Sequence, residues 1–178
     1  LLPLVQSLHD AYWDNLRSLR SLGVVVLLLR LKQSLSKYFW LNVNDPRIDL
    51  AGIIEYTNLN PCPQLGGDTL LYLPHYLPAS HPLFRTSDDV LLHLSCRSLK
   101  LIQPAFDTSW VREYHIHRDR FSQPICERGF SHRRPAMQTP ISNFYLTDSH
   151  QLHPHDRSIS DSSDLGEQVA HLILCSAG

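Results

Sequence analysis

Apolar residues at intervals of three and four mark the first segment as a helix. Leu4, Leu8, Tyr12, Leu16 and Leu19 form one stripe at that spacing. The glycine at position 23 interrupts the pattern, and three valines follow it. β-branched side chains favour extended chain, because their rotation is restricted in a helix. The pattern predicts a helix that ends before residue 23 and a buried strand that follows.

Runs of aromatic and β-branched residues predict further strands. The expected strands occupy residues 23–29, 38–43, 52–57, 69–77, 110–123 and 144–146. A polar stretch at 33–37 separates the first two, so these two are expected to form a hairpin. Along the fifth, alternate residues such as Tyr114 and Ile116 are expected to point to one side of the sheet.

Two further helices are indicated by capping residues and by apolar spacing. The first follows Thr86 and Ser87, buries a face with Leu91, Leu94, Leu99 and Ile102, and stops before Pro104. The second is expected to be capped by Asp161 or Ser162 and to bury a face with Leu165, Val169 and Leu172. Helices mixed irregularly with strands indicate an α+β fold with a mostly antiparallel sheet.

Composition narrows the classes of function. Charged residues make up 19% of the 178 residues and the formal net charge is −1, which disfavours nucleic-acid binding. No apolar run approaches the roughly 20 residues needed to span a bilayer. Four cysteines stand far apart, which suggests neither a zinc knuckle nor a disulfide framework and favours a cytoplasmic location. The chain begins with Leu1, and its single methionine is Met137, so we expect it to be an excerpt of a longer protein.

Candidate chemistry is spread over several places. The pairs His115/His117 and His153/His155 could supply metal ligands, but no third ligand is fixed by spacing, so no metal is expected. No Walker A loop and no G-x-G-x-x-G motif occurs. A strand at 144–146 that leads through a polar turn into a helix would direct free N–H groups at an anion in the turn. Aromatic and polar residues on the other strands would line a substrate cavity if Asn42, Glu55 and His75 came together.

A set of short motifs in a fixed order resembles a known family. Together they look like the C-terminal half of FAD-dependent oxidoreductases of the amine oxidase and protoporphyrinogen oxidase type, and the match extends from about Leu22 to Ala170. The motifs are YFWLNVND at 38–45, GIIEYTN at 52–58, GG at 66–67, LYL at 71–73, YLP at 76–78, QPI at 123–125, TPI at 139–141, FYL at 144–146 and P-x-DR at 154–157.

The resemblance implies that the chain has two functional segments. Residues 1–138 would form the substrate or cap domain, and residues 139–178 a strand, loop and helix that return to the FAD domain. The N-terminal dinucleotide-binding half of the same protein would be absent from this chain and would be its partner. The implied reaction is hydride transfer from a C–H or C–N centre of a small-molecule substrate to flavin N5, with no catalytic residue assigned.

The resemblance also assigns residues. Those implied to face the flavin are Asp148, Asp156, Arg157, Ser158 and Ser160. Those implied to face the substrate cavity are Trp40, Asn42, Glu55, Asn58, Tyr72 and Tyr76. A helix N-terminus beside the flavin would stabilise the negative charge that appears on reduction.

One departure from the family pattern keeps an alternative open. After Asp156-Arg157 the family typically continues Gly-Thr-Asn-Tyr-Ala, whereas Ser158-Ile159-Ser160-Asp161-Ser162 stands here. Glycine lets a backbone approach a cofactor closely, and serine restricts that approach. The chain is therefore either part of a flavoenzyme that is active only when joined to its dinucleotide-binding half, or a non-catalytic remnant or interaction module that keeps the fold without binding flavin.

Overall fold

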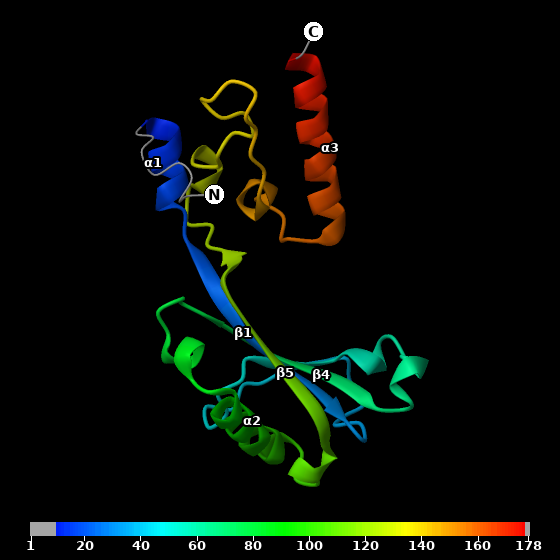
Figure 1. The fold of residues 1–178 in the computed structure, drawn as a ribbon. Coiled ribbons are helices and arrows are strands. Elements are labelled where there is room, and N and C mark those ends of the chain that lie inside the picture. Colours follow the sequence, from blue (N-terminus) through cyan, green and yellow to red (C-terminus); the bar gives the residue numbers. More distant parts are fainter. Residues whose placement is uncertain (1–9, 177–178) are drawn as a thin grey trace. The chain divides into compact units, whose positions relative to one another are not determined.

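The computed structural model describes residues 10–176, and it divides the chain into two compact units (Figure 1). Unit 1 contains residues 1–21 and 124–178, and unit 2 contains residues 22–123. This division does not follow the boundary expected at residue 138. The functional division into a substrate part and a flavin part stays a prediction, since the structural units say nothing of function.

Unit 2 is built on a five-stranded sheet, which confirms the α+β class. Its order is β2-β3-β4-β1-β5, with antiparallel pairing between β1 and β4, β3 and β4, and β2 and β3. The strands are β1 (Ser21–Leu31), β2 (Trp40–Asn42), β3 (Gly52–Glu55), β4 (Thr69–Leu77) and β5 (Val111–Pro124). The hairpin expected between the first two strands is wrong, because β2 pairs with β3 and β1 pairs with β4.

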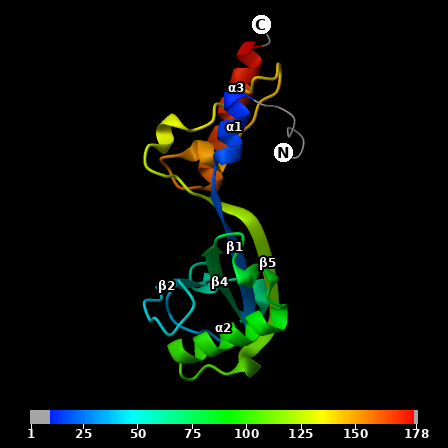
Figure 2. The same ribbon diagram turned by 90° about the vertical axis from the view of Figure 1, so that its left-hand side faces the viewer.

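One helix, α2 (Asp88–Ile102), packs against one side of this sheet, as Figure 2 shows. Alternation along the strands directs Leu29 of β1 and Leu71 of β4 toward α2, where Leu99 joins them. All three side chains are fully buried. The helix ends as expected, since Gln103 before Pro104 is extended. This shared core positions everything else in unit 2.

Unit 1 joins the two ends of the chain. Helix α1 (Ala11–Ser18) is capped by Asp10, whose carboxylate accepts the N–H groups of Tyr12 and Trp13 at 2.9 and 3.1 Å. The Trp13 side chain is 1% exposed and stacks on Phe144. Ile125 donates its N–H to the Arg20 carbonyl at 2.9 Å. The two segments that connect unit 1 to unit 2 are therefore hydrogen-bonded neighbours at residues 20 and 125. The part of the first predicted helix before residue 10 lies outside the described residues.

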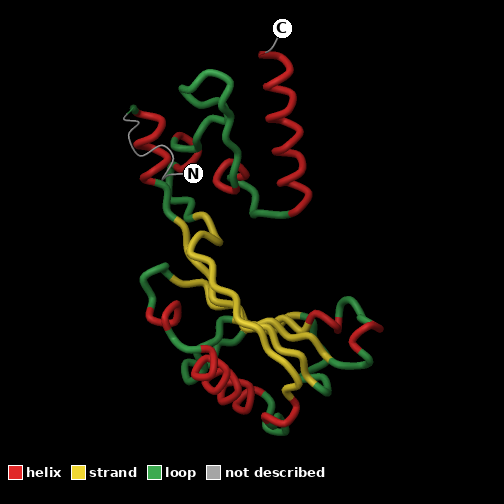
Figure 3. The backbone as a smooth tube through the Cα atoms, in the orientation of Figure 1, coloured by secondary structure: helices red, strands yellow, loops and turns green. Residues whose placement is uncertain are grey.

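The segment before the last helix is a turn rather than the expected strand. Residues 144–146 make a single β-bridge, Gln138 to Tyr145, and Figure 3 draws the surrounding segment as loop. Thr139 closes the turn, since its hydroxyl donates to the Phe144 carbonyl at 2.7 Å. Asn143 inside the turn has a φ of 59°. The segment therefore pairs with the residues just before it and has no strand neighbour.

The last helix, α3 (Ile159–Ser176), begins earlier than expected. The Ser158 hydroxyl accepts the Asp161 N–H at 3.0 Å, so Ser158 acts as the cap. On the predicted apolar face, Leu165 is buried, but Leu172 is 40% exposed. None of α1, α2 and α3, within residues 10–176, has the length and hydrophobicity of a membrane-spanning helix.

Candidate functional site

The face of the sheet that points away from α2 carries most of the predicted substrate residues. We call it the distal face and define it by Trp40, Asn42, Ile54, Tyr72 and Tyr76. Directly paired residues of neighbouring strands point to the same side, and Trp40 pairs with Ile54, which pairs with Tyr72. Tyr72 alternates with Leu71 and Leu73, whose side chains pack toward α2. The register therefore brings these side chains together on one face.

Aromatic rings dominate the distal face, and two polar groups lie beside them. Trp40 is 53% exposed, and its indole N–H donates to the Asn42 side-chain oxygen at 2.8 Å. Tyr72 is half-buried and meets Tyr56 edge to face, with ring centroids 6.3 Å apart. The Tyr72 hydroxyl makes no hydrogen bond to another residue in the range 10–176. Flat rings with a few free polar groups are typical of a wall that binds an organic ligand.

A charged cluster borders this face and joins Asp68, which precedes β4, to β1 and β5. The Asp68 carboxylate accepts Arg30 Nε at 2.7 Å and Arg112 Nε at 2.9 Å. Arg30 pairs in register with Leu70, which alternates to the same side as Tyr72. Burial works to raise the pKa of Asp68, but the two guanidinium groups outweigh it and hold the pKa below its usual range. The carboxylate therefore stays ionised and fixes both arginines at neutral pH.

Glu55, also predicted to face a substrate, lies on the α2 side of the sheet. It pairs in register with the buried Leu71, and it is 1% exposed. Its two carboxylate oxygens accept four hydrogen bonds from residues 34–36, at 2.6 to 3.0 Å. These bonds hold the turn after β1. The predicted substrate contact stays untested, whereas this support of the turn is observed.

Asn58 supports the same turn from the other side. Its amide donates to the Ser36 and Tyr38 carbonyls, both at 3.0 Å. His75 also lies on the α2 side, since it follows Leu71 and Leu73 at intervals of two along β4. The structure thus does not bring Asn42, Glu55 and His75 to one face, which was the condition for a cavity built on those three residues.

The residues predicted to face a flavin lie in unit 1, around the start of α3. Asp148 caps the short turn Ser149–Leu152, in which His150 donates its N–H to the carboxylate at 2.9 Å. Arg157, Ser158 and neighbouring residues line an open depression of about 560 Å³. Ser160 is exposed on the first turn of α3. Ser158, Ser160 and Arg157 are therefore close along the chain, while Asp148 belongs to the preceding turn.

The start of α3 has both donors and competing acceptors. The N–H groups of Ile159 and Ser160 make no hydrogen bond within the described part of the chain, as expected for the first turn of a helix. The next N–H, of Asp161, is already taken by the Ser158 hydroxyl, which itself donates to the Asp161 carboxylate at 2.5 Å. Two backbone donors remain for an acceptor atom of a ligand.

Asp148 and His150 form a partly buried ion pair that sequence reasoning missed. His150 Nδ1 lies 3.2 Å from the Asp148 carboxylate, and Nε2 lies 3.4 Å from the Arg20 carbonyl. The hydrogen bond to Asp148 raises the pKa of His150, against the opposing effect of burial. Burial works to raise the pKa of Asp148, but hydrogen bonds from His150 outweigh it and lower that pKa. Only spatial contact reveals this pair, since an Asp-x-His spacing is common.

Metal ligands do not gather in the structure. Across residues 10–176, no three His, Cys, Asp or Glu side chains come together in a way that could hold a metal ion. His115 contacts Glu113 at 3.0 Å, His153 contacts Ser131 at 3.2 Å, and all four cysteines are free thiols.

Comparisons with known proteins give a likeness of fold. The chain is similar to a candidate protoporphyrinogen oxidase from Exiguobacterium sp. 255-15, with a TM-score of 0.58, 19% identity and 74% of this chain covered. It is also similar to an oxidoreductase from Methanosarcina mazei, with a TM-score of 0.52, 19% identity and 76% covered. The chain spans 29% and 30% of those two chains. No protein-family model and no curated protein matches.

Proposed function

We propose that this chain is part of an FAD-dependent oxidoreductase of the amine oxidase or protoporphyrinogen oxidase type. In this proposal unit 2 is the substrate part, its distal face forms one wall of the substrate cavity, and the start of α3 faces the flavin. The dinucleotide-binding half of the same protein would hold most of the cofactor. The proposal includes a small-molecule substrate and a cytoplasmic location.

One observation carries this proposal: the sheet has a helix on one face only, within unit 2. The other face carries Trp40, Asn42 and Tyr72 in register, with free hydrogen-bonding groups between aromatic rings. A purely structural sheet would cover such rings with its own core, whereas Trp40 is 53% exposed. The likeness of fold to two oxidoreductase structures supports the same interpretation.

The start of α3 has backbone donors that suit a flavin and a carboxylate that does not. The two free N–H groups at Ile159 and Ser160, together with the positive end of the helix dipole, suit the carbonyl and N1 side of an isoalloxazine. The Asp161 side chain beside them is an unfavourable neighbour for negative charge. When bound, flavin would supply the hydride acceptor, and this chain would orient substrate and provide backbone donors.

A second candidate function is a non-catalytic module that keeps the fold. The Ser158–Asp161 cap favours it, because a side chain and its hydrogen bonds stand where the family pattern has a glycine. Such a module would contain no flavin and would use the distal face to bind a partner protein through its exposed rings.

The visible spectrum of the protein encoded by the complete gene separates the two functions. Under the first, the purified protein shows the two bands of oxidised flavin, and substrate bleaches them in the absence of oxygen. A colourless protein that also fails to take up added FAD would contradict the first function and favour the second. A matched Ser158→Gly variant tests the cap, since it removes the hydroxyl and should tighten FAD binding.

A further inference from the structure

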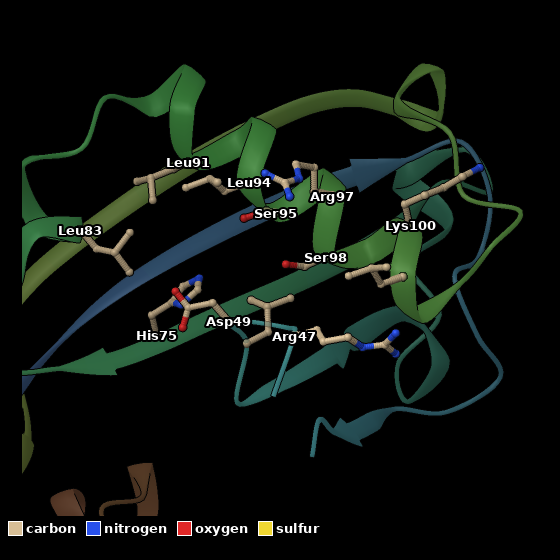
Figure 4. A pocket seen from close by; sticks show the side chains of 12 residues that line it. Arg47, Asp49, His75, Leu83, Leu91, Leu94, Ser95, Arg97, Ser98 and Lys100 are labelled. Atoms are coloured by element: carbon tan, nitrogen blue, oxygen red, sulfur yellow. The ribbon is translucent and has the colours of Figure 1, made fainter. Parts of the chain in front are cut away.

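A cavity of about 340 Å³ lies on the α2 side of the sheet, away from the distal face. It is enclosed by α2, by β4 and by the loop before β3 (Figure 4). Its size is at the lower end of the range for small-molecule sites, which is about 300–1,000 Å³. The cavity lies entirely within unit 2, so its geometry does not depend on how the two units are arranged.

Five leucine side chains form the apolar part of the cavity wall. Leu91, Leu94 and Leu101 line the cavity from α2, where helical spacing puts them on one face. Leu50, before β3, and Leu83, before α2, line it from the other sides. Leu91 and Leu50 are buried, whereas Leu94 is 42% exposed. Apolar walls of this kind would hold the hydrocarbon part of a ligand.

Polar groups enter the cavity from two sides. Figure 4 shows Ser95, Arg97 and Ser98 on α2, and Asp49 and His75 on the other wall of the cavity. None of these five side chains makes a hydrogen bond to another side chain or to the backbone in residues 10–176. Ser95 is only 5% exposed. Donors and acceptors that lack a partner in the protein are available to a ligand.

The balance of charge around the cavity is positive. Arg47 is held by Asp45 with hydrogen bonds of 2.5 to 3.1 Å, and Lys100 donates to the Phe106 carbonyl at 2.7 Å. Arg97 has no such partner among the described residues and is exposed at the rim. A guanidinium binds a carboxylate with two parallel hydrogen bonds, which makes Arg97 the natural anchor for an anion.

His75 contributes a neutral polar group at the opposite wall. Burial lowers the pKa of its imidazole, with the Asp49 carboxylate acting in the other direction. A neutral imidazole both donates and accepts a hydrogen bond. The cavity thus offers a cationic rim, apolar walls and, at the opposite wall, a polar end made by the His75 imidazole and the Asp49 carboxylate.

We infer that this cavity is a binding site for a small organic carboxylate with an apolar body, anchored at Arg97 and by the hydroxyls of Ser95 and Ser98. It is separate from the proposed substrate wall and from the proposed flavin contact. Binding of a carboxylate in this cavity does not require a flavin, so a test of this site is independent of the proposed function.

Titration calorimetry of the full 178-residue chain with hexanoate tests the inference. Hexanoate should bind saturably to one site at millimolar or lower concentration. Hexanol, which lacks the charge, and acetate, which lacks the apolar body, should each bind at least tenfold more weakly. Equal binding of hexanol and hexanoate, or no hexanoate binding at all, would overturn the inference.

Two matched variants locate the site. Arg97→Gln should weaken hexanoate binding about tenfold or more, whereas Arg128→Gln removes the same charge from an exposed position in unit 1 and should leave it unchanged. Both arginines are exposed, so neither change disturbs the core. Ser98→Leu, which fills the cavity, should abolish binding, and hexanoate should shift the NMR signals of His75. Unchanged affinity in both Arg97→Gln and Ser98→Leu would place hexanoate elsewhere and refute the site.

Discussion

Ser36 donates both its backbone N–H and its hydroxyl to the same carboxylate oxygen of Glu55, at 2.9 and 3.0 Å. The second oxygen accepts the Leu35 N–H at 2.9 Å and the Ser34 hydroxyl at 2.6 Å. A single buried side chain on β3 therefore shapes the turn that follows β1. The chain that leaves this turn continues into β2, which pairs with β3 and not with β1.

Glu55→Gln should destabilise unit 2. The amide nitrogen of glutamine cannot accept a hydrogen bond, so N–H or O–H donors of the turn lose their acceptor in a buried place. We expect a loss of about 2–3 kcal/mol in the free energy of unfolding, measured by urea denaturation. Glu167→Gln, the same change at an exposed position on α3, is the control and should change stability by less than about 0.5 kcal/mol. Equal stability of the two variants would show that the turn does not need the carboxylate.

Gly23→Ala should also destabilise the protein, for a steric reason. A Cβ atom at this position would lie 2.5 Å from the Phe84 ring and 2.7 Å from the Asp119 carbonyl oxygen. Backbone has to move to make room, and overpacking of this kind costs about 1–3 kcal/mol. Gly166→Ala in α3 meets nothing within 4 Å and should stabilise the protein by about 0.5–1 kcal/mol. Thermal unfolding of both variants checks the opposite signs.

The Asp148–His150 pair should make stability depend on pH. The pKa of His150 is raised in the folded chain, so its contribution is complete below the unfolded value of about 6.5 and is lost as pH rises through the folded value. The pKa of Asp148 is lowered, so its contribution is complete above about pH 4 and is lost as pH falls through the folded value. Stabilisation by the pair is therefore greatest between about pH 4 and pH 6.5.

Urea unfolding at a series of pH values measures this dependence. His150→Gln should remove the decrease in the free energy of unfolding that the pair causes above about pH 6.5, since glutamine does not titrate. His93→Gln, at an exposed position in α2, is the matched control and should leave the profile unchanged. An NMR titration in which His150 loses its proton at or below the usual histidine range would contradict the ion pair.

Tyr72→Phe should impair the proposed oxidoreductase without unfolding it. The Tyr72 hydroxyl has no hydrogen-bond partner within residues 10–176, so its removal leaves the described contacts intact. If it binds substrate, kcat/KM of the flavin-containing protein should fall about 2- to 10-fold, the equivalent of one hydrogen bond. Tyr114→Phe removes a hydroxyl on the α2 side, where it donates to Asp89 at 3.1 Å, and should leave kcat/KM unchanged. Equal effects of both changes would argue against a substrate role for the distal face.

The sequence predicted local structure better than pairing. The run of strand-forming residues at 69–77, with Tyr72 and Tyr76, predicted β4 with the bounds that the structure has. Which strands pair depends on contacts between residues that are far apart in the sequence. The residues at 32–37 contain no pattern that predicts their hydrogen bonds to Glu55. The turn at 139–146 was missed for a similar reason, since the half-buried Phe144 stacks on Trp13 in the first helix and does not lie in a sheet.

The candidate site was only partly accessible to sequence reasoning. The motifs pointed to Trp40, Asn42 and Tyr72, and the register puts these three on one face. Glu55 lies on the opposite face because it pairs with Leu71, whereas its neighbour Ile54 pairs with Tyr72. A sequence motif does not encode this register. The cavity on the α2 side was missed because its polar residues come from three separate stretches of the sequence, at 47–49, 75 and 95–100, and only the packing of α2 over the sheet assembles them.

The discontinuous make-up of unit 1 has a consequence for synthesis on the ribosome. All residues of unit 2 emerge before the segment at 124–178 that completes unit 1. Trp13 is made before all of unit 2, yet its stacking partner Phe144 follows more than a hundred positions later. On the nascent chain the side chain of Trp13 therefore lacks its stacking partner while the sheet forms, and it is exposed to chaperones during that time.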